Sequence, residues 1–135
     1  MSFTRDLLAG LKAHLVSQGI TATIVIGQDL PSSPDEALAL NLYDSEDFVE
    51  VARSDVRVQA MCRGVANDSL DSADVADQIF DILHGLEGLW IGELHVTLCS
   101  RLSVVPLGID TAKRTVRADN YELTVDVPTS ARRPI

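Results

Sequence analysis

Residues that commonly carry catalysis, metal binding or base stacking are scarce in this sequence. Its 135 residues include three histidines, two cysteines and one tryptophan, and aromatic residues make up 4%. No His-x-x-x-His or Cys-x-x-Cys pair occurs, and neither a phosphate-binding glycine loop nor a Gly-x-Ser-x-Gly elbow is present. Trp90 is flanked by Glu87 and Glu93 instead of the basic neighbours that favour stacking on nucleic acid. The sequence therefore gives no starting point for an enzyme or a nucleic-acid-binding module.

Long hydrophobic runs are also missing. No apolar stretch approaches the roughly 20 residues that cross a bilayer as a helix. Charges interrupt the N-terminal stretch MSFTRDLLAGLKAHL, unlike the apolar centre of a signal peptide. We therefore expect assembly in the cytoplasm and no membrane partner. In that reducing compartment Cys62 and Cys99 are expected to be free thiols that fill the core.

Positive charge is scarce except near the C-terminal end. Eleven Lys and Arg residues stand against twenty Asp and Glu residues, which gives a net charge of -9 and disfavours tight binding to a phosphate backbone. No Lys or Arg occurs between Lys12 and Arg53 or between Arg63 and Arg101, whereas the balance is basic after residue 100. Such asymmetry allows the acidic body of one copy to contact the basic end of another. A solvated acidic surface is the alternative interpretation.

Hydrophobic periodicity predicts two helices and five strands. Helical spacing of apolar residues marks 4–17 and 71–85. Segments that are rich in β-branched residues or that alternate predict strands over 20–26, 37–43, 56–63, 93–104 and 116–127. The expected fold is α+β, a twisted and mainly antiparallel sheet of about five strands packed by two helices, in the order α β β β α β β. Residues 1–128 then form one domain, and 129–135 form a C-terminal arm.

The second predicted helix has an apolar face and an acidic face that do not overlap. The aspartates of the acidic face are Asp71, Asp74, Asp77 and Asp81. Asp71 or Ser72 is expected to cap this helix, as Ser2 or Thr4 caps the first one. Carboxylates suit a hard cation, but ion sites need sharper convergence from loops. A solvated or partner-facing helix surface is therefore the favoured interpretation, and no metal or cofactor is expected.

Two pairs of residues have the types that catalysis uses. His95 and Cys99 alternate along one predicted strand, but four residues of strand separate them by about 13 Å, too far for direct hydrogen bonding. Glu46 and Asp47 offer two carboxylates, yet nothing around them would raise one pKa as acid–base chemistry requires. Neither pair supports a prediction of enzymatic activity.

Four segments, in their order and spacing, resemble a known family. They are LPSSPDEALALNLYD (30–44), VRVQAMCRG (56–64), ADQIFDILHGLEGL (76–89) and PLGIDTAKRTVRADNYELTVDVPT (106–129). Together they resemble the tail-terminator and minor capsid (head-tail joining) proteins of siphophages of actinobacteria and related hosts. Three features are most telling: a Pro-Asp step before an alternating strand, a helix that ends in His-Gly-Leu, and an Asn-Tyr-x-Leu-x-Val strand that ends in proline.

The resemblance implies a structural virion protein without enzymatic activity or cofactor. Family members form a ring, usually a hexamer, at the head-proximal end of the tail tube, and they stop tube polymerisation at the correct length. They then present a surface to the stopper or connector proteins of the neck, while DNA passes through the lumen without specific binding. The implied partners are copies of the chain itself, the major tail tube protein and a neck protein. The implied location is the tail or neck of the virion, after assembly in the host cytoplasm.

Two segments and the arm are the predicted partner contacts. The first segment is the acidic stretch 44–55, a long loop or a short helix with Phe48 as an apolar anchor, and the second is the 106–117 connection. Ordinary surface loops are the alternative interpretation of both. The candidate interface residues are Asp44, Glu46, Asp47, Phe48, Glu50, Lys113, Arg114, Arg117, Arg132 and Arg133.

Three other functions compete with a tail terminator. Another head-tail connector or head-completion protein of the neck differs in position rather than in chemistry. A small ligand-binding α/β module should show a glycine-rich turn between strand and helix, and none is present. A hydrolase needs a nucleophile, a base and a residue that orients the base, which the sequence does not assemble.

Overall fold

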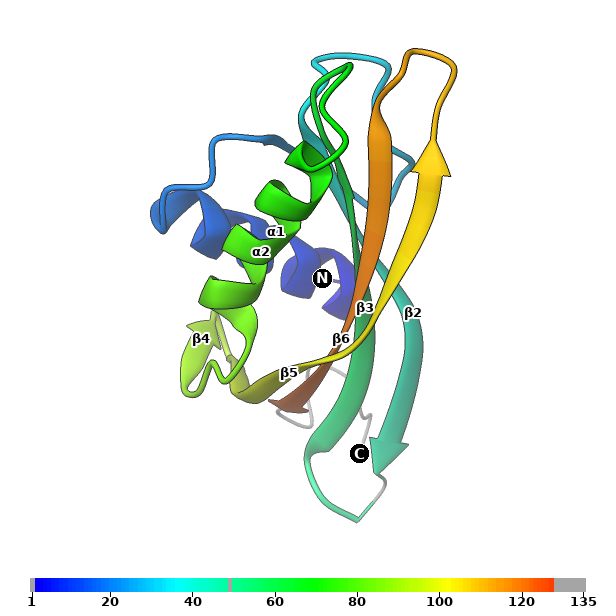
Figure 1. The fold of residues 1–135 in the computed structure, drawn as a ribbon. Helices are drawn as coiled ribbons and strands as arrows, with labels where there is room; N and C mark the ends of the chain where they lie inside the picture. Colours follow the sequence, from blue (N-terminus) through cyan, green and yellow to red (C-terminus); the bar gives the residue numbers. More distant parts are fainter. Residues whose placement is uncertain (1, 49, 128–135) are drawn as a thin grey trace.

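The computed structural model describes residues 2–48 and 50–127. Its elements are α1 (Phe3–Ser17), β1 (Thr23–Ile26), β2 (Ala37–Phe48), β3 (Arg53–Arg63), α2 (Asp71–Leu83), β4 (Leu89–Ile91), β5 (Leu94–Ile109) and β6 (Thr115–Asp126), as Figure 1 shows. Neither helix in these ranges is long and apolar enough to cross a membrane. The two predicted helices and all five predicted strands are therefore present, with shifted ends.

All strands belong to one curved sheet in the order β1-β2-β3-β6-β5-β4. β1 runs parallel to β2, and the other neighbouring pairs are antiparallel. The predicted α+β class is confirmed, with two differences. Over the described residues the sheet has six strands instead of about five, because β4 forms a short hairpin with β5, and it is mixed because of β1.

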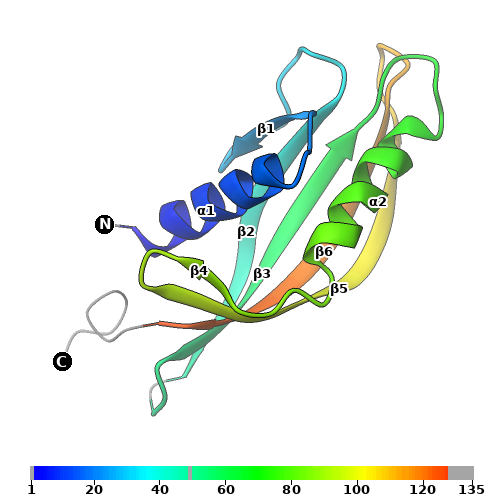
Figure 2. The ribbon, with the colours of Figure 1, turned by 90° about the vertical axis from the view of Figure 1, so that its left-hand side faces the viewer.

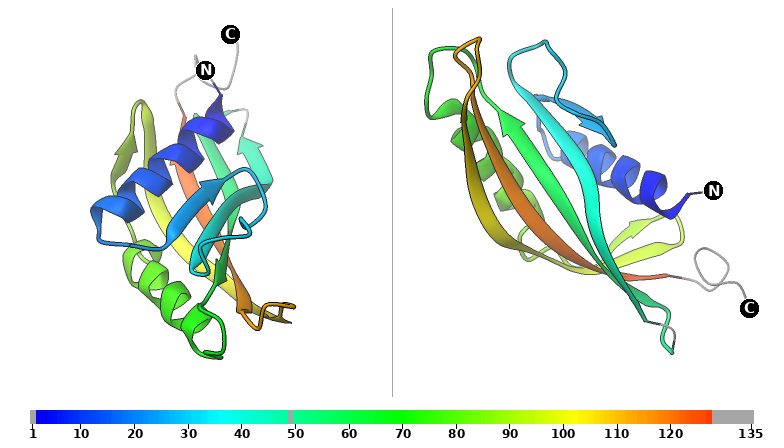
Figure 3. Two further views of the ribbon diagram at one scale, coloured as in Figure 1. Left: turned by 90° about the horizontal axis from the view of Figure 1, so that it is seen from above. Right: turned by 90° about the vertical axis from the view of Figure 1, so that its right-hand side faces the viewer.

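Both helices cover the same face of the sheet (Figure 2 and the right-hand view of Figure 3). The core forms between the apolar stripes of the helices and the inward residues of the strands, such as Val56 and Val58 of β3 and Leu123 and Val125 of β6. Successive strand residues point to opposite faces. The outward residues of β3 and β6 are accordingly more polar, as in the cross-strand ion pair of Arg57 with Glu122.

The helix caps were predicted correctly for α1 and wrongly for α2. The Ser2 hydroxyl accepts a hydrogen bond from the backbone N–H of Arg5 and so caps α1. Leu70 is the N-cap of α2 and has no side-chain cap hydrogen bond. The Asp71 carboxylate instead accepts from the backbone N–H of Val65, and the Ser72 hydroxyl shares a 2.8 Å hydrogen bond with that of Thr115. These hydrogen bonds connect α2 to the preceding loop and to β6. The two side chains therefore do not cap the N-terminus of α2.

Gly64 allows α2 to start close to the end of β3. A Cβ atom added at Gly64 would lie 2.5 Å from the backbone nitrogen of Ser72 and 2.7 Å from the Cβ of Asp71. Real Cβ atoms do not approach a rigid backbone that closely, so a larger residue would push α2 off the sheet. Gly64 is therefore required because its neighbours leave no room for a side chain. Its backbone does not adopt the positive φ that usually favours glycine.

Two segments that were expected to be loops are mostly strand. β2 continues to Phe48 and β3 begins at Arg53, so only a tight turn is left of the predicted loop 44–55. β5 reaches Ile109 and β6 begins at Thr115, which leaves a short turn within the 106–117 connection. Both hairpin ends extend beyond the helices (Figure 1). Most side chains of these strand ends are exposed, and the alternation of apolar and polar residues that marks a strand is lost.

Cys62 and Cys99 are free and buried, as predicted. Burial raises the pKa of the Cys99 thiol to about 12. Burial also raises the pKa of Cys62 far above its ordinary value, and the negative charge of Asp119 adds to the effect. Both thiols therefore remain protonated in the fold well above the pH at which an exposed thiol ionises.

The free energy of unfolding should fall as the pH rises above about 8.5, where thiols of the unfolded chain ionise. The buried thiols of the folded state keep their protons in that range. The unfolded state therefore binds fewer protons than the folded state, and a rising pH shifts the equilibrium toward unfolding. Each thiol should lower the free energy of unfolding by about 1.4 kcal/mol per pH unit between its unfolded and folded pKa. Denaturant unfolding at several pH values in that range measures the slope.

The double variant Cys62→Ala, Cys99→Ala is the control for this slope. Its small cavities lower the stability at neutral pH, but the decline at alkaline pH should be shallower than in the wild type. Equal slopes in the two proteins would show that the buried thiols do not cause the decline.

Candidate assembly surface

One long edge of the sheet, along β5, lacks a strand partner over most of its length. The strand pairs with β6 over nearly its whole length, but β4 pairs on the other side only with Leu94, His95 and Val96. From residue 97 to 109 no strand within the described ranges pairs with that side, but the segment that follows α2 bonds the first part of it. The Cys99 N–H donates to the Leu86 carbonyl, the Cys99 carbonyl accepts from the Gly85 N–H, and the Arg101 N–H donates to His84 Nδ1. The stretch from residue 102 to 109 is the part without such partners among the described residues. The free N–H and C=O groups of an edge strand are a template for pairing with another chain. We call residues 97–109 the β5 edge.

Large apolar side chains are exposed along the β5 edge. They are Leu98, Leu102, Val104, Val105, Leu107 and Ile109. Their exposed fractions range from 39% to 62%. Single exposed apolar residues are ordinary, but a contiguous apolar patch marks a surface that binds another molecule.

Irregular pairing bends the β5 edge. Its register with β6 shifts near residues 97, 102 and 107, and Pro106 lacks the N–H group that a ladder would need. Bulges and edge prolines are features that prevent indiscriminate pairing of sheet edges. We therefore expect the β5 edge to bind mainly through its apolar side chains, with only short stretches of backbone pairing.

An apolar groove lies beside the distal end of the β5 edge. It has a volume of about 390 Å³ and runs between the start of α2, with Ser69 and Ala73, and the β5–β6 hairpin, with Pro106 and Ile109. Leu70, which follows Ser69, is 68% exposed. The groove and the β5 edge share Pro106 and Ile109, so they form one continuous surface.

The predicted acidic contacts lie at the end of the β2–β3 hairpin. Asp44 forms an ion pair with Arg57 at 3.7 Å, but more than half of its side chain is exposed. Glu46 lies opposite Asp55 on β3, and Glu46 and Glu50 are exposed. These acids are therefore available to a partner at this end of the sheet.

Asp47 and Phe48 are held more tightly by the hairpin itself. The Asp47 carboxylate accepts hydrogen bonds from the hydroxyls of Ser45 and Ser54 at 2.9 and 2.7 Å. The Arg53 guanidinium lies 4.5 Å over the ring of Phe48, which is a cation–π distance. Phe48 is half-buried by this contact, so it stabilises the hairpin and leaves only part of its ring for a partner.

The predicted basic contacts lie at the opposite end of the sheet, on the β5–β6 hairpin (Figure 1). Lys113 is exposed in the turn, with a φ of 66°. Arg114 is only 12% exposed, because its guanidinium pairs with Asp110 at 2.9 Å and with Asp35 at 3.3 Å. Arg114 thus ties the turn to the loop before β2, and Lys113 is the residue that faces solvent.

Arg117 belongs to a partly buried charge network. Its guanidinium pairs with Asp119 at 2.8 Å and with Asp77 of α2 at 3.0 Å, and Arg101 pairs with Asp119 at 3.3 Å. Hydrogen bonds to Asp119 and then to Asp77 raise the pKa of Arg117 above its ordinary value. The network links α2, β5 and β6 under the β5 edge, so Arg117 contributes to the rigidity of that surface.

Arg132 and Arg133 lie outside the described residues. The structure brings Asp44, Glu46, Asp47, Phe48 and Glu50 together at one hairpin end, and Lys113, Arg114 and Arg117 at the other. It does not bring the two groups together within one chain. Their contact with partners stays a prediction.

The residue pairs considered for chemistry do not form a reactive site. The register shift near residue 97 places His95 opposite Asp126 and Cys99 opposite Leu123, so the two side chains point to opposite faces. Cys99 is buried in the core, whereas His95 stacks on Trp90 with ring centroids 4.1 Å apart. Within residues 2–48 and 50–127 no group of three or more His, Cys, Asp or Glu is arranged to hold a metal ion.

The β5 edge was not identified from the sequence. The expected strand ended near residue 104 because Pro106 and Gly108 read as breakers. The available signal was the run Leu102 to Ile109, in which apolar residues occur at both odd and even positions. In a two-layer fold that pattern indicates a strand without a polar face, and such a strand needs a covering partner on each side.

Comparisons with known proteins point to the phage tail. A family model described as bacteriophage tail terminator protein matches residues 14–127. Among solved structures, a chain of the virion of a native gene transfer agent (GTA) particle has the same fold. The two are 14% identical with a TM-score of 0.62, and the match covers 93% of this chain and 95% of that chain. None of the curated proteins matches the sequence.

The double variant Leu102→Lys, Leu107→Lys tests the β5 edge. Both side chains are about half exposed, so the fold should keep its stability to within about 0.5 kcal/mol per substitution. Two charges in an apolar contact should weaken association between molecules by tenfold or more, since about 1.4 kcal/mol corresponds to tenfold. Sedimentation velocity over a concentration series measures the change.

The matched control is Val16→Lys, Val51→Lys, because these residues are 54% and 53% exposed and lie away from β5. Its association should equal that of the wild type. If the control weakened association as much as the β5 variant, general charge would be the cause and the β5 edge would lose its role.

Proposed function

The chain belongs to the bacteriophage tail terminator family, and we propose that it is the subunit of a ring at the head-proximal end of the tail tube. As a family member it is a structural protein of the virion, in its tail or neck. In the proposed role the ring, a hexamer, ends tube polymerisation and joins the tail to the neck. The observation that carries this proposal is the β5 edge, which has exposed apolar side chains and no strand partner among the described residues.

A ring also needs a second surface, because its contacts join two different patches of the same chain. The opposite side of the sheet offers one. β1 pairs only with residues 37–40 of β2, so no described strand pairs with that side of residues 41–48, which we call the β2 edge. Tyr43 stands on it and is 50% exposed, and exposed tyrosines are favoured anchors of interfaces.

The strand directions suit a contact between these two edges. β5 is antiparallel to β6, β6 to β3, and β3 to β2, so β5 and β2 run in opposite directions. Rotation about an axis along the strands keeps the direction of β2 in the next copy. The β5 edge of one subunit then runs antiparallel to β2 of its neighbour. Across the sheet Gly108 is level with Ala37 and Ser103 is level with Asn41, so the strands must be inclined to the ring axis for the β5 edge to meet the β2 edge.

The ends of the sheet remain for the partners above and below the ring. The acidic β2–β3 hairpin, with Asp44, Glu46 and Glu50, and the β5–β6 turn, with Lys113, project along the strand direction (Figure 1). We propose that these two ends contact the major tail tube protein and a stopper or connector protein of the neck. The net charge of -9 makes the lumen repel the duplex, so that DNA passes without specific binding.

Deletion of the gene from the phage or GTA genome that carries it should give overlong tails without heads. Without a terminator the tube end stays competent for polymerisation and presents no surface for the neck. Negative-stain electron microscopy of the particles measures tail length and head attachment, and complementation in trans restores both. Full heads beside separate tails of normal length would assign the chain to a connector or head-completion role instead.

A mixing experiment tests the head-to-tail contact. Leu107→Lys disables the β5 edge and Tyr43→Lys disables the β2 edge, so each variant alone should fail to form rings. Each retains the edge that the other lacks, so an equimolar mixture should form dimers and stop there. Native mass spectrometry of the mixture, with one variant isotopically labelled, measures the composition. Rings in either variant alone, or no mixed dimer, would contradict the proposed pairing of edges.

A further inference from the structure

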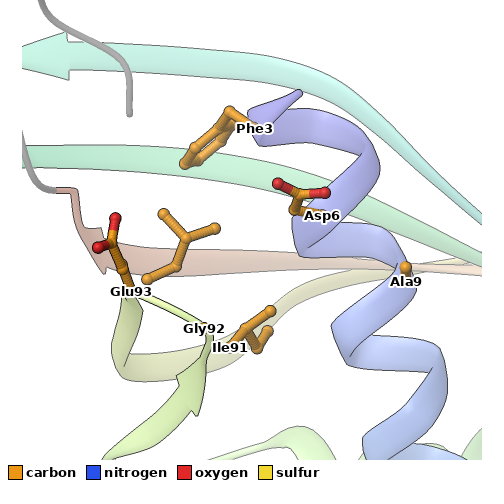
Figure 4. Close-up of a pocket in the computed structure, with 7 residues that line it drawn as sticks. Phe3, Asp6, Ala9, Ile91, Gly92 and Glu93 are labelled. Carbon is orange, nitrogen blue, oxygen red and sulfur yellow. The ribbon is translucent and has the colours of Figure 1, made fainter. Parts of the chain in front are cut away.

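An apolar pocket opens between α1 and the hairpin of β4 and β5 (Figure 4). It has a volume of about 530 Å³. Phe3 and Ala9 line it from α1, and Ile91 and Leu94 line it from the hairpin. The close contact of α1 with Ile91, where Gly10 leaves room for the isoleucine side chain, fixes the depth of the pocket. The pocket is therefore a preformed part of the fold.

Two carboxylates stand at this pocket, Asp6 on α1 and Glu93 at the tip of the β4–β5 hairpin (Figure 4). Neither forms an ion pair with any described residue. No lysine or arginine among residues 2–48 and 50–127 lines the pocket. An apolar hollow with two unpaired negative charges is complementary to a segment that carries both apolar residues and cations.

The end of β6 leads to the same place. Val127, which directly follows β6, lines a second apolar hollow together with Trp90 and Glu93. Glu93 thus belongs to both hollows, and the pocket lies just around the hairpin tip from Val127. Residues 128–135, with the sequence PTSARRPI, come next in the chain. They hold two of the eleven Lys and Arg residues and none of the twenty acids.

We propose that residues 128–135 bind the pocket of their own chain, with Arg132 and Arg133 paired to Asp6 and Glu93. Each extended residue spans about 3.3 Å, so five residues beyond Val127 reach about 16 Å, and Arg132 comes within range of the hairpin tip. The segment ends on Pro134 and Ile135, whose apolar side chains suit the lining of Phe3, Ile91 and Leu94. The occupant is thus identified by reach, charge and apolar content.

Attachment favours the same chain over a neighbouring copy. A short covalent connection to Val127 holds the segment at an effective concentration in the millimolar range. Binding within the chain also covers the hollow beside Trp90, which is 62% exposed in the described residues. The inference is independent of the ring, since it concerns a single subunit.

The experiment compares the full chain with two charge-reversed forms by ¹⁵N relaxation. At a concentration where sedimentation shows a monomer, the amides of Arg132, Arg133 and Ile135 should have order parameters near those of rigid backbone, about 0.85. In Asp6→Lys, Glu93→Lys they should fall below about 0.6. Combining that change with Arg132→Glu, Arg133→Glu should restore the high values, because the charges are then exchanged. Glu87→Lys, an exposed acid outside the pocket, is the control and should leave them unchanged.

A second pair of variants tests the apolar part of the site. Ala9 is exposed and lines the pocket, whereas Ala13 is exposed one turn further along α1 and does not. Ala9→Trp should fill the pocket and release the segment, while Ala13→Trp should have no effect. The proposal is overturned if residues 132–135 are as mobile in the wild type as in the charge-reversed form. It is also overturned if they become ordered only after subunits associate, since the segment would then bind a neighbour.

Discussion

The structure depends on a mismatch of length between its helices and its strands. α1 has 15 residues and α2 has 13, so they are about 22 and 20 Å long at 1.5 Å per residue. β5 has 16 residues and extends over about 53 Å at 3.3 Å per residue. Two short helices on one face cannot cover strands of that length. The hydrophobic core therefore occupies only the middle of the sheet, and the β2–β3 and β5–β6 hairpin ends extend beyond the helices (Figure 1).

Polar side chains take over where the helices end. On the face of the sheet away from the helices, Arg57 pairs with Glu122 and with Asp44, which joins β2, β3 and β6. Exposed ion pairs of this kind contribute little stability, about 0 to 1 kcal/mol each. The overhanging ends are thus held in register mainly by continuity with the packed centre, where Val58 lies opposite Tyr121. This arrangement gives stiff projections with surfaces free for partners.

The same mismatch explains which parts of the fold were predictable from the sequence. α1, α2, β3 and the middle of β6 carry clear periodicity because one side of each packs on the core. The continuation of β2 to Phe48 and of β5 to Ile109 has no such pattern, because most of its side chains are exposed. Only the start of α2 lies beside the end of β5, across the apolar groove. The acidic residues at the β2–β3 hairpin were found as a group from the sequence, but the intramolecular pairing of Arg114 and Arg117 was not, since Asp35 and Asp77 come from distant segments.

In the proposed ring, the apolar β5 edge and the acidic body act together to make association selective. Net charge far from zero keeps copies of a chain apart, and the bulges and Pro106 prevent regular pairing of one β5 edge with another. A contact must then bury enough apolar side chains in a shape that fits the bends near residues 97, 102 and 107. A partner strand that lacks this shape forms few backbone hydrogen bonds with the β5 edge. Electrostatic repulsion between the negatively charged chains then still opposes its binding. In the proposed ring, an exposed edge that would be an aggregation site in a neutral, flat sheet serves as a surface for one matched partner.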